Sequence, residues 1–370
     1  MNLTKEKIDL IHILRAVVCQ DDTVIGSDID WERIWKLART NHLETVVYRA
    51  APEDQRARME NTYLLSVARS VRQGRLLGTI ESELRDHRIA FAPQKGSILR
   101  NDYPDAIYRF MSDIDIYIRP SDREKIRTAL EPANGKLRGS ESGDDQFIFP
   151  ANLGVEFHGR LLYRKTKNGI ENYPDWSYVD TGKNRLTEEG FALNLIGHAV
   201  YDLSKGGPGI RYILDLWVYR HRHSPQPDWD LVWDKLKEDR IDQAAKNLMD
   251  LSEYLFGTGE ASPVIDELAE YVLAAGLHGD PIRGAASEMA RSGSKSKAIC
   301  KQVFRSRTEF ENRYPWVKKC PLLLPVAWIV RLFSSFRKNR SHIKSWLKNI
   351  GSTETDEINS QRERLKRFGL

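Results

Sequence analysis

The chain has few cysteines, no long uninterrupted apolar run and no internal repeat. Its three cysteines, Cys19, Cys300 and Cys320, are odd in number and far apart, which argues against a disulfide framework and against a cysteine-rich zinc site. Charged residues such as Lys5 and Lys7 interrupt the apolar residues at the N-terminus, so the apolar core of a signal peptide is missing. These absences favour a cytoplasmic protein. A length of 370 residues favours two or three packed units.

Acidic residues are scarce in the C-terminal region. From Arg291 to Leu370 there are 19 Lys or Arg against 6 Asp or Glu, a net charge of +13, whereas residues 1–290 hold 38 against 46, a net charge of −8. This asymmetry predicts an anionic partner for the C-terminal region: nucleic acid, lipid headgroups or the acidic body of the protein itself.

Within that region, residues 320–336 are strongly apolar and are followed by the basic residues Arg337, Lys338 and Arg340. The segment is too short and too interrupted for a transmembrane helix, which needs about 20 apolar residues. Packing against the protein body is therefore the favoured interpretation. An anchor at an anionic membrane surface, which would make the protein membrane-peripheral, is the alternative.

Apolar periodicity predicts helices on both sides of a small mixed sheet, an α+β fold. Helical spacing over 4–18, 30–50 and about 56–87 predicts an N-terminal helical region, residues 1–88. Short strands at 89–92, 112–118, about 146–149 and 154–158, with a helix over about 121–130, form a compact core, residues 89–185. A C-terminal helical region, residues 186–350, begins with Thr187 as N-cap. Residues 351–370 read as a polar, partly disordered tail.

Two carboxylates share one face of the strand predicted at 112–118. Its residues alternate between polar and apolar, so Asp113 and Asp115 point the same way, about 6.6–7 Å apart. Asp is disfavoured in strands, and the two charges repel unless a cation lies between them, so the pattern favours a divalent metal site. Glu156 lies on a later strand, and His158, two residues on, shares its face. A solvated edge strand is the structural alternative.

Three features occur in a telling order: Lys95-Gly96-Ser97, then Ser112–Asp115, then Glu156 on a later strand. With Tyr103-Pro104 and Arg109, they resemble the DNA polymerase β-like nucleotidyltransferases. Within that superfamily the chain most resembles an uncharacterised bacterial nucleotidyltransferase family with the signature Lys-Gly, Tyr-Pro, Arg, Ser-Asp-Ile-Asp.

The resemblance implies that residues 89–185 are a nucleotidyltransferase core. It would move a nucleoside monophosphate from an NTP co-substrate to a hydroxyl-bearing acceptor and release pyrophosphate, with two Mg²⁺ ions, or Mn²⁺ in their place. Asp113 and Asp115 would hold both metals. Glu156 would be the third carboxylate, near the acceptor, and a general base.

The resemblance also implies a set of binding residues. Gly96 would let the backbone approach the triphosphate, Ser97 would donate a hydrogen bond to the β- and γ-phosphates, and Lys95 would add a positive charge. Arg109 belongs to the nucleotide-binding set. His158 would orient Glu156 or bind the acceptor.

Other interpretations remain open. The acceptor is a small molecule, a protein or an RNA. A catalytically silent nucleotide-binding protein, or a membrane-peripheral interaction protein, is the alternative function, and the intact set of acids argues against the silent form. His198 reads as a core histidine. Arg211 and Asp215, spaced i,i+4, read as a helix ion pair or as part of a site for the base or ribose.

Overall fold

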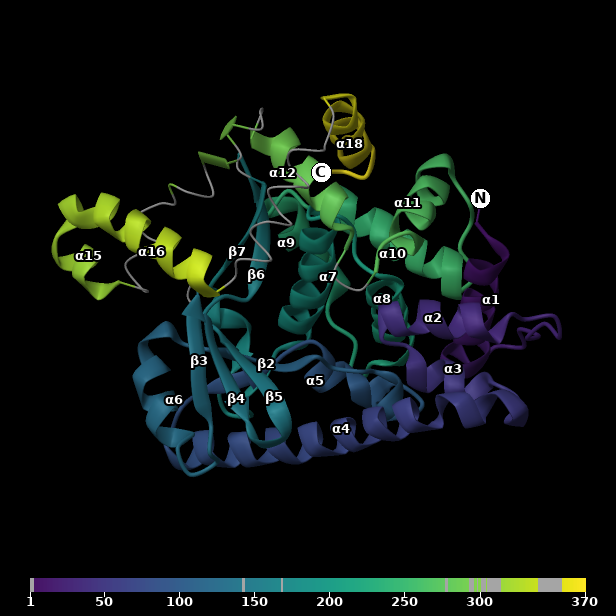
Figure 1. Ribbon diagram of the computed structural model, residues 1–370, viewed down its shortest axis with the longest axis horizontal. Helices are drawn as coiled ribbons and strands as arrows, with labels where there is room; N and C mark the ends of the chain where they lie inside the picture. Colours follow the sequence, from purple (N-terminus) through teal and green to yellow (C-terminus); the bar gives the residue numbers. More distant parts are fainter. Residues whose placement is uncertain are drawn as a thin grey trace.

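The computed structural model describes residues 3–141, 144–167, 169–276, 279–292, 296–297, 299–300, 304, 314–338 and 355–370. Helices surround one five-stranded mixed sheet and two small two-stranded sheets in these ranges, which confirms the α+β class (Figure 1).

The N-terminal helices are α1 (Lys5–Leu14), a π-helical turn (Arg15–Cys19), α2 (Trp31–Asn41), α3 (Glu44–Ala50) and α4 (Glu53–Asp86). Asp30 caps α2 by accepting a hydrogen bond from the amide of Arg33. The helical spacing over 30–50 corresponds to two helices, because His42 adopts a left-handed conformation with φ of 53° and ends α2. The ring of His42 stacks on Phe110 with 4.4 Å between centroids.

Helix α4 is 34 residues long, about 51 Å, and runs along the whole base of the molecule (Figure 1). Near its start, Tyr63 stacks on Tyr48 of α3 with 4.0 Å between ring centroids. In its middle, Gln73 Nε2 donates to the carbonyl oxygen of Met111 over 3.0 Å. Near its end, Ile80 belongs to the core beneath the sheet. One helix therefore contacts both the helical part and the sheet.

The sheet has the order β1-β2-β5-β4-β3. Its strands are β1 (Phe91–Pro93), β2 (Asp113–Ile118), β3 (Lys136–Glu141), β4 (Asp144–Phe149) and β5 (Leu153–His158), with α6 (Arg123–Ala129) between β2 and β3. Strands β2 and β5 pair in parallel and the other neighbours pair antiparallel. The two predicted acid-bearing strands are therefore direct neighbours, although they are far apart in sequence.

Shorter elements complete the middle of the chain. The sequence did not predict β3 or the hairpin of β6 (Leu162–Thr166) and β7 (Gly169–Tyr173). Helix α5 (Gly96–Leu99) and the pair β8 (Val179–Asp180) and β9 (Arg185–Leu186) are also short. One-turn 3-10 helices lie at Arg100–Asp102, Ala106–Tyr108, Pro120–Asp122, Pro150–Asn152 and Trp176–Tyr178.

The C-terminal helices are α7 (Glu188–Ser204), α8 (Ile210–Arg222), α9 (Trp229–Glu238), α10 (Asp242–Phe256), α11 (Pro263–Leu273) and α12 (Pro281–Ser292). The predicted N-cap of α7 is confirmed, because Thr187 Oγ1 accepts a hydrogen bond from the amide of Gly190 over 3.1 Å. Ser262 caps α11 in the same way through the amide of Ile265.

Two apolar cores hold these layers. The larger core joins the N-terminal helices to α7, α8 and α10, with Leu10, Val46, Leu214 and Leu251 among its buried members. The smaller core lies between the sheet and the helices α4 and α6. Because α4 covers one face of the sheet, the opposite face is left to meet α7 and α8 (Figure 1).

Residues 351–370 were predicted as a polar, partly disordered tail, but the part that the structure describes forms a helix, α18 (Thr355–Arg367). It packs on α12, and Gln361, Leu365 and Phe368 are buried. Gln361 Nε2 donates to the hydroxyl groups of Tyr271 and Ser287 over 2.7 and 3.0 Å. The segment is polar overall, but its buried residues recur at helical spacing, which is enough to dock it.

The apolar segment predicted to pack on the body forms a separate hairpin instead: α15 (Pro315–Lys319), a 3-10 turn (Pro321–Leu323) and α16 (Leu324–Lys338). Leu322 is 89% exposed and Phe333 is 76% exposed. Arg340 and the side chains of Arg337 and Lys338 lie outside what the structure describes. The exposed apolar side chains, Leu322 and Phe333 among them, therefore do not pack against the body, whereas Ala327 is buried and Trp328 contacts the ring of Phe304.

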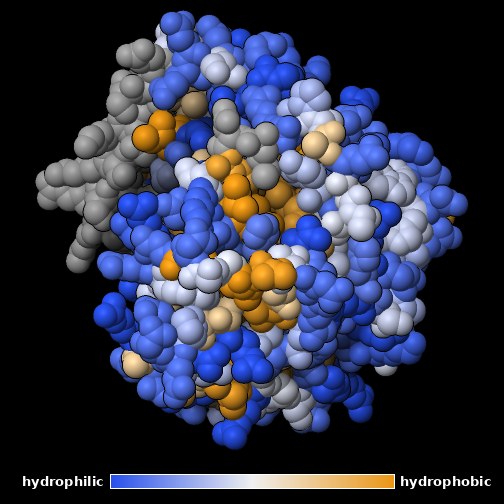
Figure 2. All heavy atoms as spheres, turned by 90° about the vertical axis from the view of Figure 1, so that its right-hand side faces the viewer, coloured by the Kyte–Doolittle hydropathy of each residue, from blue (hydrophilic) through white to orange (hydrophobic). Residues whose placement is uncertain are grey.

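The face on the right-hand side of Figure 1 is mostly hydrophilic, with apolar side chains gathered at its centre (Figure 2). No helix among the described residues is both long enough and apolar enough to cross a bilayer.

Candidate active site

The acids of β2 and β5 share the sheet face that meets α7 and α8. The parallel register places Asp115 opposite Glu156 and Asp113 opposite Gly154. Alternation along each strand then gives Asp113, Asp115, Glu156 and His158 the same direction. The structure thus brings together the three acids and the histidine that the sequence singled out.

Asp115 is held by two cations. Lys95 Nζ donates to Asp115 Oδ1 over 3.1 Å, and His158 Nε2 donates to the same oxygen over 2.6 Å. Burial by itself would raise the pKa of Asp115, but Lys95 and His158 hold that pKa well below its usual range. Asp115 is therefore a carboxylate at neutral pH, and its Oδ2 takes no part in either contact.

His158 is paired with acids in this arrangement. Burial lowers its pKa, but the hydrogen bond to Asp115 and the carboxylate of Asp144, 3.6 Å from its Nδ1, outweigh burial and raise the pKa to about 9. Its Nε2 lies 3.7 Å from a carboxylate oxygen of Glu156, so its direct partner is Asp115. The ligand atoms of Asp115, Glu156 and His158 lie within 4.8 Å of one another, close enough to share one metal ion, which would displace the proton of His158 on binding to it.

Lys95 reaches Asp115 from a strained backbone. Its φ is 47° and its ψ is −123°, a conformation that residues with a Cβ rarely adopt. Its side chain is largely buried, and although burial lowers its pKa, the charge of Asp115 raises it above the ordinary value. The resemblance implied a positive charge at this position, and the structure places the ammonium group against Asp115.

Asp113 and Glu156 make no ion pair with a Lys or Arg among the described residues, and Lys95, which is paired with Asp115, acts on them only through its nearby charge. Asp113 accepts a hydrogen bond from Ser112 Oγ over 2.9 Å, and Glu156 accepts one from Gln146 Nε2 over 2.8 Å. The pKa of Asp113 is raised by burial and by the charge of Asp115, and the pKa of Glu156 is raised by burial and by the charge of Asp113. Three carboxylates with surplus negative charge are a donor set that fits Mg²⁺.

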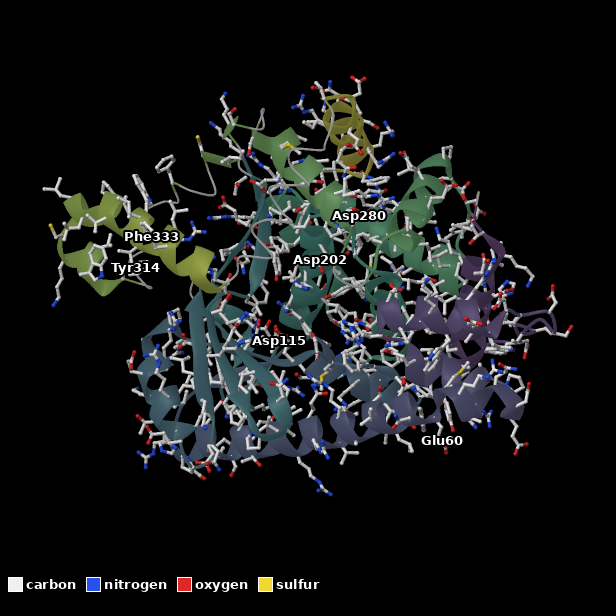
Figure 3. The ribbon with its side chains drawn as sticks, in the orientation of Figure 1. Glu60, Asp115, Asp202, Asp280, Tyr314 and Phe333 are labelled. Carbon is white, nitrogen blue, oxygen red and sulfur yellow. The ribbon has the colours of Figure 1, made fainter. Side chains whose placement is uncertain are left out.

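A cavity of about 280 Å³ lies over these acids. The sheet supplies one wall through Asp113, Asp115 and Glu156, and α7 and α8 supply the other. That helical wall consists of His198, Asp202, Lys205, Gly207, Arg211 and Tyr212. Asp115 and Asp202 lie on these two different elements in Figure 3. The cavity therefore has an acidic wall and a wall that contains cations.

Arg211 is the main unassigned cation of the helical wall. It is almost fully buried, and its Nη1 donates to the carbonyl oxygen of Phe110 over 3.1 Å. Its Nε has no hydrogen-bond partner among the described residues. The helix ion pair expected with Asp215 is replaced, because Asp215 accepts instead from Arg109 Nε and the Tyr103 hydroxyl over 2.7 and 2.6 Å. Arg211 therefore lines the cavity without an ion pair to Asp215, whereas Arg109, which also lines it, pairs with Asp215.

Asp202 and His198 form a second titratable pair in the cavity. His198 Nε2 lies 3.4 Å from Asp202 Oδ2, and its Nδ1 lies 3.0 Å from the Tyr163 hydroxyl. Burial raises the pKa of Asp202 to about 7, and burial with the nearby charge of Lys95 lowers the pKa of His198 well below its usual value. The sequence predicted a core histidine at His198, and the structure shows that this residue also lines the cavity.

The structure places Gly96 and Ser97 at two different cavities. Gly96 lines the cavity, and a Cβ added to it would lie 3.1 Å from Met111 Cγ and 3.2 Å from Arg109 Cζ. Ser97 is buried and faces a second cavity of about 340 Å³ on the other side of α5. Its Oγ has no hydrogen-bond partner among the described residues. The phosphate-binding role of Ser97 stays a prediction.

Sequence reasoning missed Asp202 and Lys205 altogether. Asp202 lies in the last turn of α7 and Lys205 directly follows that helix, next to Gly206-Gly207 and a few residues before Arg211 in α8. A glycine pair flanked by charges between two apolar helices was a usable signal, since such turns bring the ends of neighbouring helices to one place.

The sequence of the chain matches the model of a protein family. A sequence model of a family described as "Uncharacterised nucleotidyltransferase" matches residues 27–257, more than half of the chain. The chain belongs to this nucleotidyltransferase family, which confirms the family predicted from its motifs. No curated protein and no solved structure matches the chain.

Proposed function

We propose that the protein transfers a nucleoside monophosphate from an NTP to an acceptor hydroxyl group. The observation that carries this proposal is the pairing of three acids on one wall of the cavity with cations on the opposite wall. Carboxylates bind divalent cations and can accept a proton from the attacking hydroxyl group, whereas Lys and Arg side chains bind a polyphosphate.

The reaction has a simple balance. The acceptor oxygen forms a bond to the α-phosphorus, the bond from that phosphorus to the bridging oxygen breaks, and pyrophosphate leaves with the electron pair. Glu156 accepts the proton of the acceptor hydroxyl group, because its raised pKa brings it closer to the working pH of a general base. Arg211 and Lys205 bind the phosphates that leave.

The residues present fit a divalent metal. Asp113, Asp115 and Glu156 would hold Mg²⁺, which when bound supplies charge stabilisation to the attacking and leaving oxygens. Lys95 and His158 keep Asp115 ionised and fix its orientation. They do so from the side of Oδ1, so that Oδ2 is left for other contacts.

The experiment is calorimetric titration of a non-hydrolysable α,β-methylene NTP analogue, with and without Mg²⁺. Asp113→Asn, Asp115→Asn and Glu156→Gln should each remove most of the magnesium-dependent part of the affinity. Glu60→Gln is the matched control, because Glu60 is exposed on α4, far from Asp115 (Figure 3). Affinity that depends equally on Mg²⁺ in the parent and in all three site variants would contradict the proposal.

A further inference from the structure

The described residues 314–338, called the C-terminal hairpin below, present an apolar stripe to solvent. Val326, Ile329, Val330 and Phe333 follow one another at i, i+3, i+4 and i+7, and all four are exposed. Leu322, in the turn before α16, is also exposed. This spacing places the side chains on one face of the helix. Exposed apolar patches of this kind mark interaction surfaces rather than ordinary surface.

The hairpin has its own small core on the opposite face. Ala327 and Val317 are fully buried, and Trp316, Leu324 and Trp328 pack against them. The exposure of the stripe is therefore not a result of incomplete packing, because the opposite side of α16 already packs in this small core. Tyr314 and Phe333 lie at the edge of the molecule, well away from Asp115 (Figure 3).

The sequence around the hairpin has one sign of charge. Residues 312–353 contain nine Lys or Arg and no Asp or Glu. Lys319 is exposed at the end of α15. An apolar stripe within a purely basic segment complements a surface that is apolar inside and anionic outside.

We propose that the C-terminal hairpin docks the protein on the surface of an anionic lipid bilayer. The apolar side chains of α16 enter the boundary between headgroups and acyl chains, and the basic residues contact the lipid phosphates. Helix α16 has 15 residues and an arginine, Arg331, within it, so it lies along the surface and does not cross the bilayer.

Two other occupants fit less well. A second copy of the hairpin would bring two strongly basic segments together, which like-charge repulsion disfavours. A nucleic acid would satisfy the charge but would leave the aliphatic stripe in water, because phosphates and sugars offer it no apolar partner. The lipid surface satisfies both features at once.

The experiment is co-sedimentation of the full chain with vesicles. One set contains phosphatidylcholine with phosphatidylglycerol, and the other contains phosphatidylcholine alone. The parent should bind the anionic vesicles, and binding should weaken as salt is raised. The double variant Ile329→Glu, Phe333→Glu should bind at least about tenfold less, because it removes two apolar side chains from the membrane boundary and adds two negative charges.

The matched control is Leu64→Glu, Leu65→Glu, because these two leucines of α4 are also exposed but lie outside the hairpin. The control should bind vesicles as the parent does, and thermal unfolding should show that both double variants are folded. The proposal is overturned if the parent protein does not bind anionic vesicles, or if the hairpin variant binds them as tightly as the parent does. Loss of a dimer in the hairpin variant, in a parent without vesicle binding, also overturns it in favour of a second copy. RNA binding that survives in the hairpin variant, with no vesicle binding in the parent, overturns it in favour of nucleic acid.

Discussion

The contact between Arg109 and Asp215 joins the loop before β2 to helix α8, so its removal tests how the two walls of the cavity are held together. Asp215 is 0% exposed and accepts from both Arg109 and Tyr103. The substitution Asp215→Asn keeps the size of the side chain and removes its charge. The guanidinium group of Arg109, itself buried, then has no carboxylate to balance it.

The magnitude follows from the burial of both partners. Removal of one member of a buried ion pair costs about 3–5 kcal/mol, because the other charge stays in a medium that cannot solvate it. Tyr103→Phe removes one hydrogen bond to a charged group and should cost less, about 1.5–3 kcal/mol. Replacement of both charges, as Arg109→Met with Asp215→Leu, should recover much of the loss, because no unpaired charge remains.

The assay is urea unfolding followed by tryptophan fluorescence and far-UV circular dichroism. Asp234→Asn is the matched control, since Asp234 makes an exposed ion pair with Lys237 over 3.0 Å. That control should change the free energy of unfolding far less than Asp215→Asn. If Asp215→Asn stays within about 1 kcal/mol of the parent, the view that this buried pair holds the two walls together is wrong.

Three further predictions concern the cavity. Burial raises the pKa of Asp202 to about 7, so the folded protein holds a proton that the unfolded chain releases above about pH 4. The free energy of unfolding should therefore fall by at most about 4 kcal/mol as pH rises from about 4 to 7. Urea unfolding of Asp202→Asn over that range should show no such decline. Gly96→Ala should lower the melting temperature because its Cβ meets two side chains at 3.1 and 3.2 Å, whereas Gly78→Ala, with nothing within 4 Å, should raise it; the opposite order would refute the close approach at Gly96. Arg211→Met should weaken binding of an NTP analogue about tenfold or more in calorimetry but leave NMP binding nearly unchanged, and equal losses for both ligands would contradict the assignment of Arg211 to the leaving phosphates.

The acidic wall could be predicted because its signal is local. Asp113 and Asp115 alternate with apolar residues along one strand, so their shared face follows from the period of a β-strand. The later strand with Glu156 was also recognised, but its place beside β2 was not predicted. The parallel pairing with Asp115 opposite Glu156 comes from the structure.

The helical wall could not be predicted in the same way, because its residues meet the acids only through tertiary packing. Asp202 and Arg211 follow Asp115 by more than eighty residues, and nothing in their local pattern points to that strand. The partner of Asp215 was misassigned for the same reason, since an i,i+4 neighbour is visible in the sequence and Arg109 is not. The helix α18 is a different case: Gln361, Leu365 and Phe368 have helical spacing, and a polar composition concealed it.

Helix α4 holds the sheet and the helical part together without lining the cavity between them. Gly74 and Gly78 lie in its second half, between the stacking contact of Tyr63 and the core contact of Ile80. A Cβ at Gly78 would meet nothing within 4 Å, and one at Gly74 would approach only Arg100, at 3.9 Å. Packing therefore does not require glycine at either position.

Each glycine lowers helix stability by about 1 kcal/mol relative to alanine. The two glycines flank Leu76 and Leu77, which pack against the core beneath the sheet, so a small bend of α4 there would shift the sheet and change the separation of the acidic and helical walls. The width of the cavity would then depend on residues at the base of the molecule that do not line it.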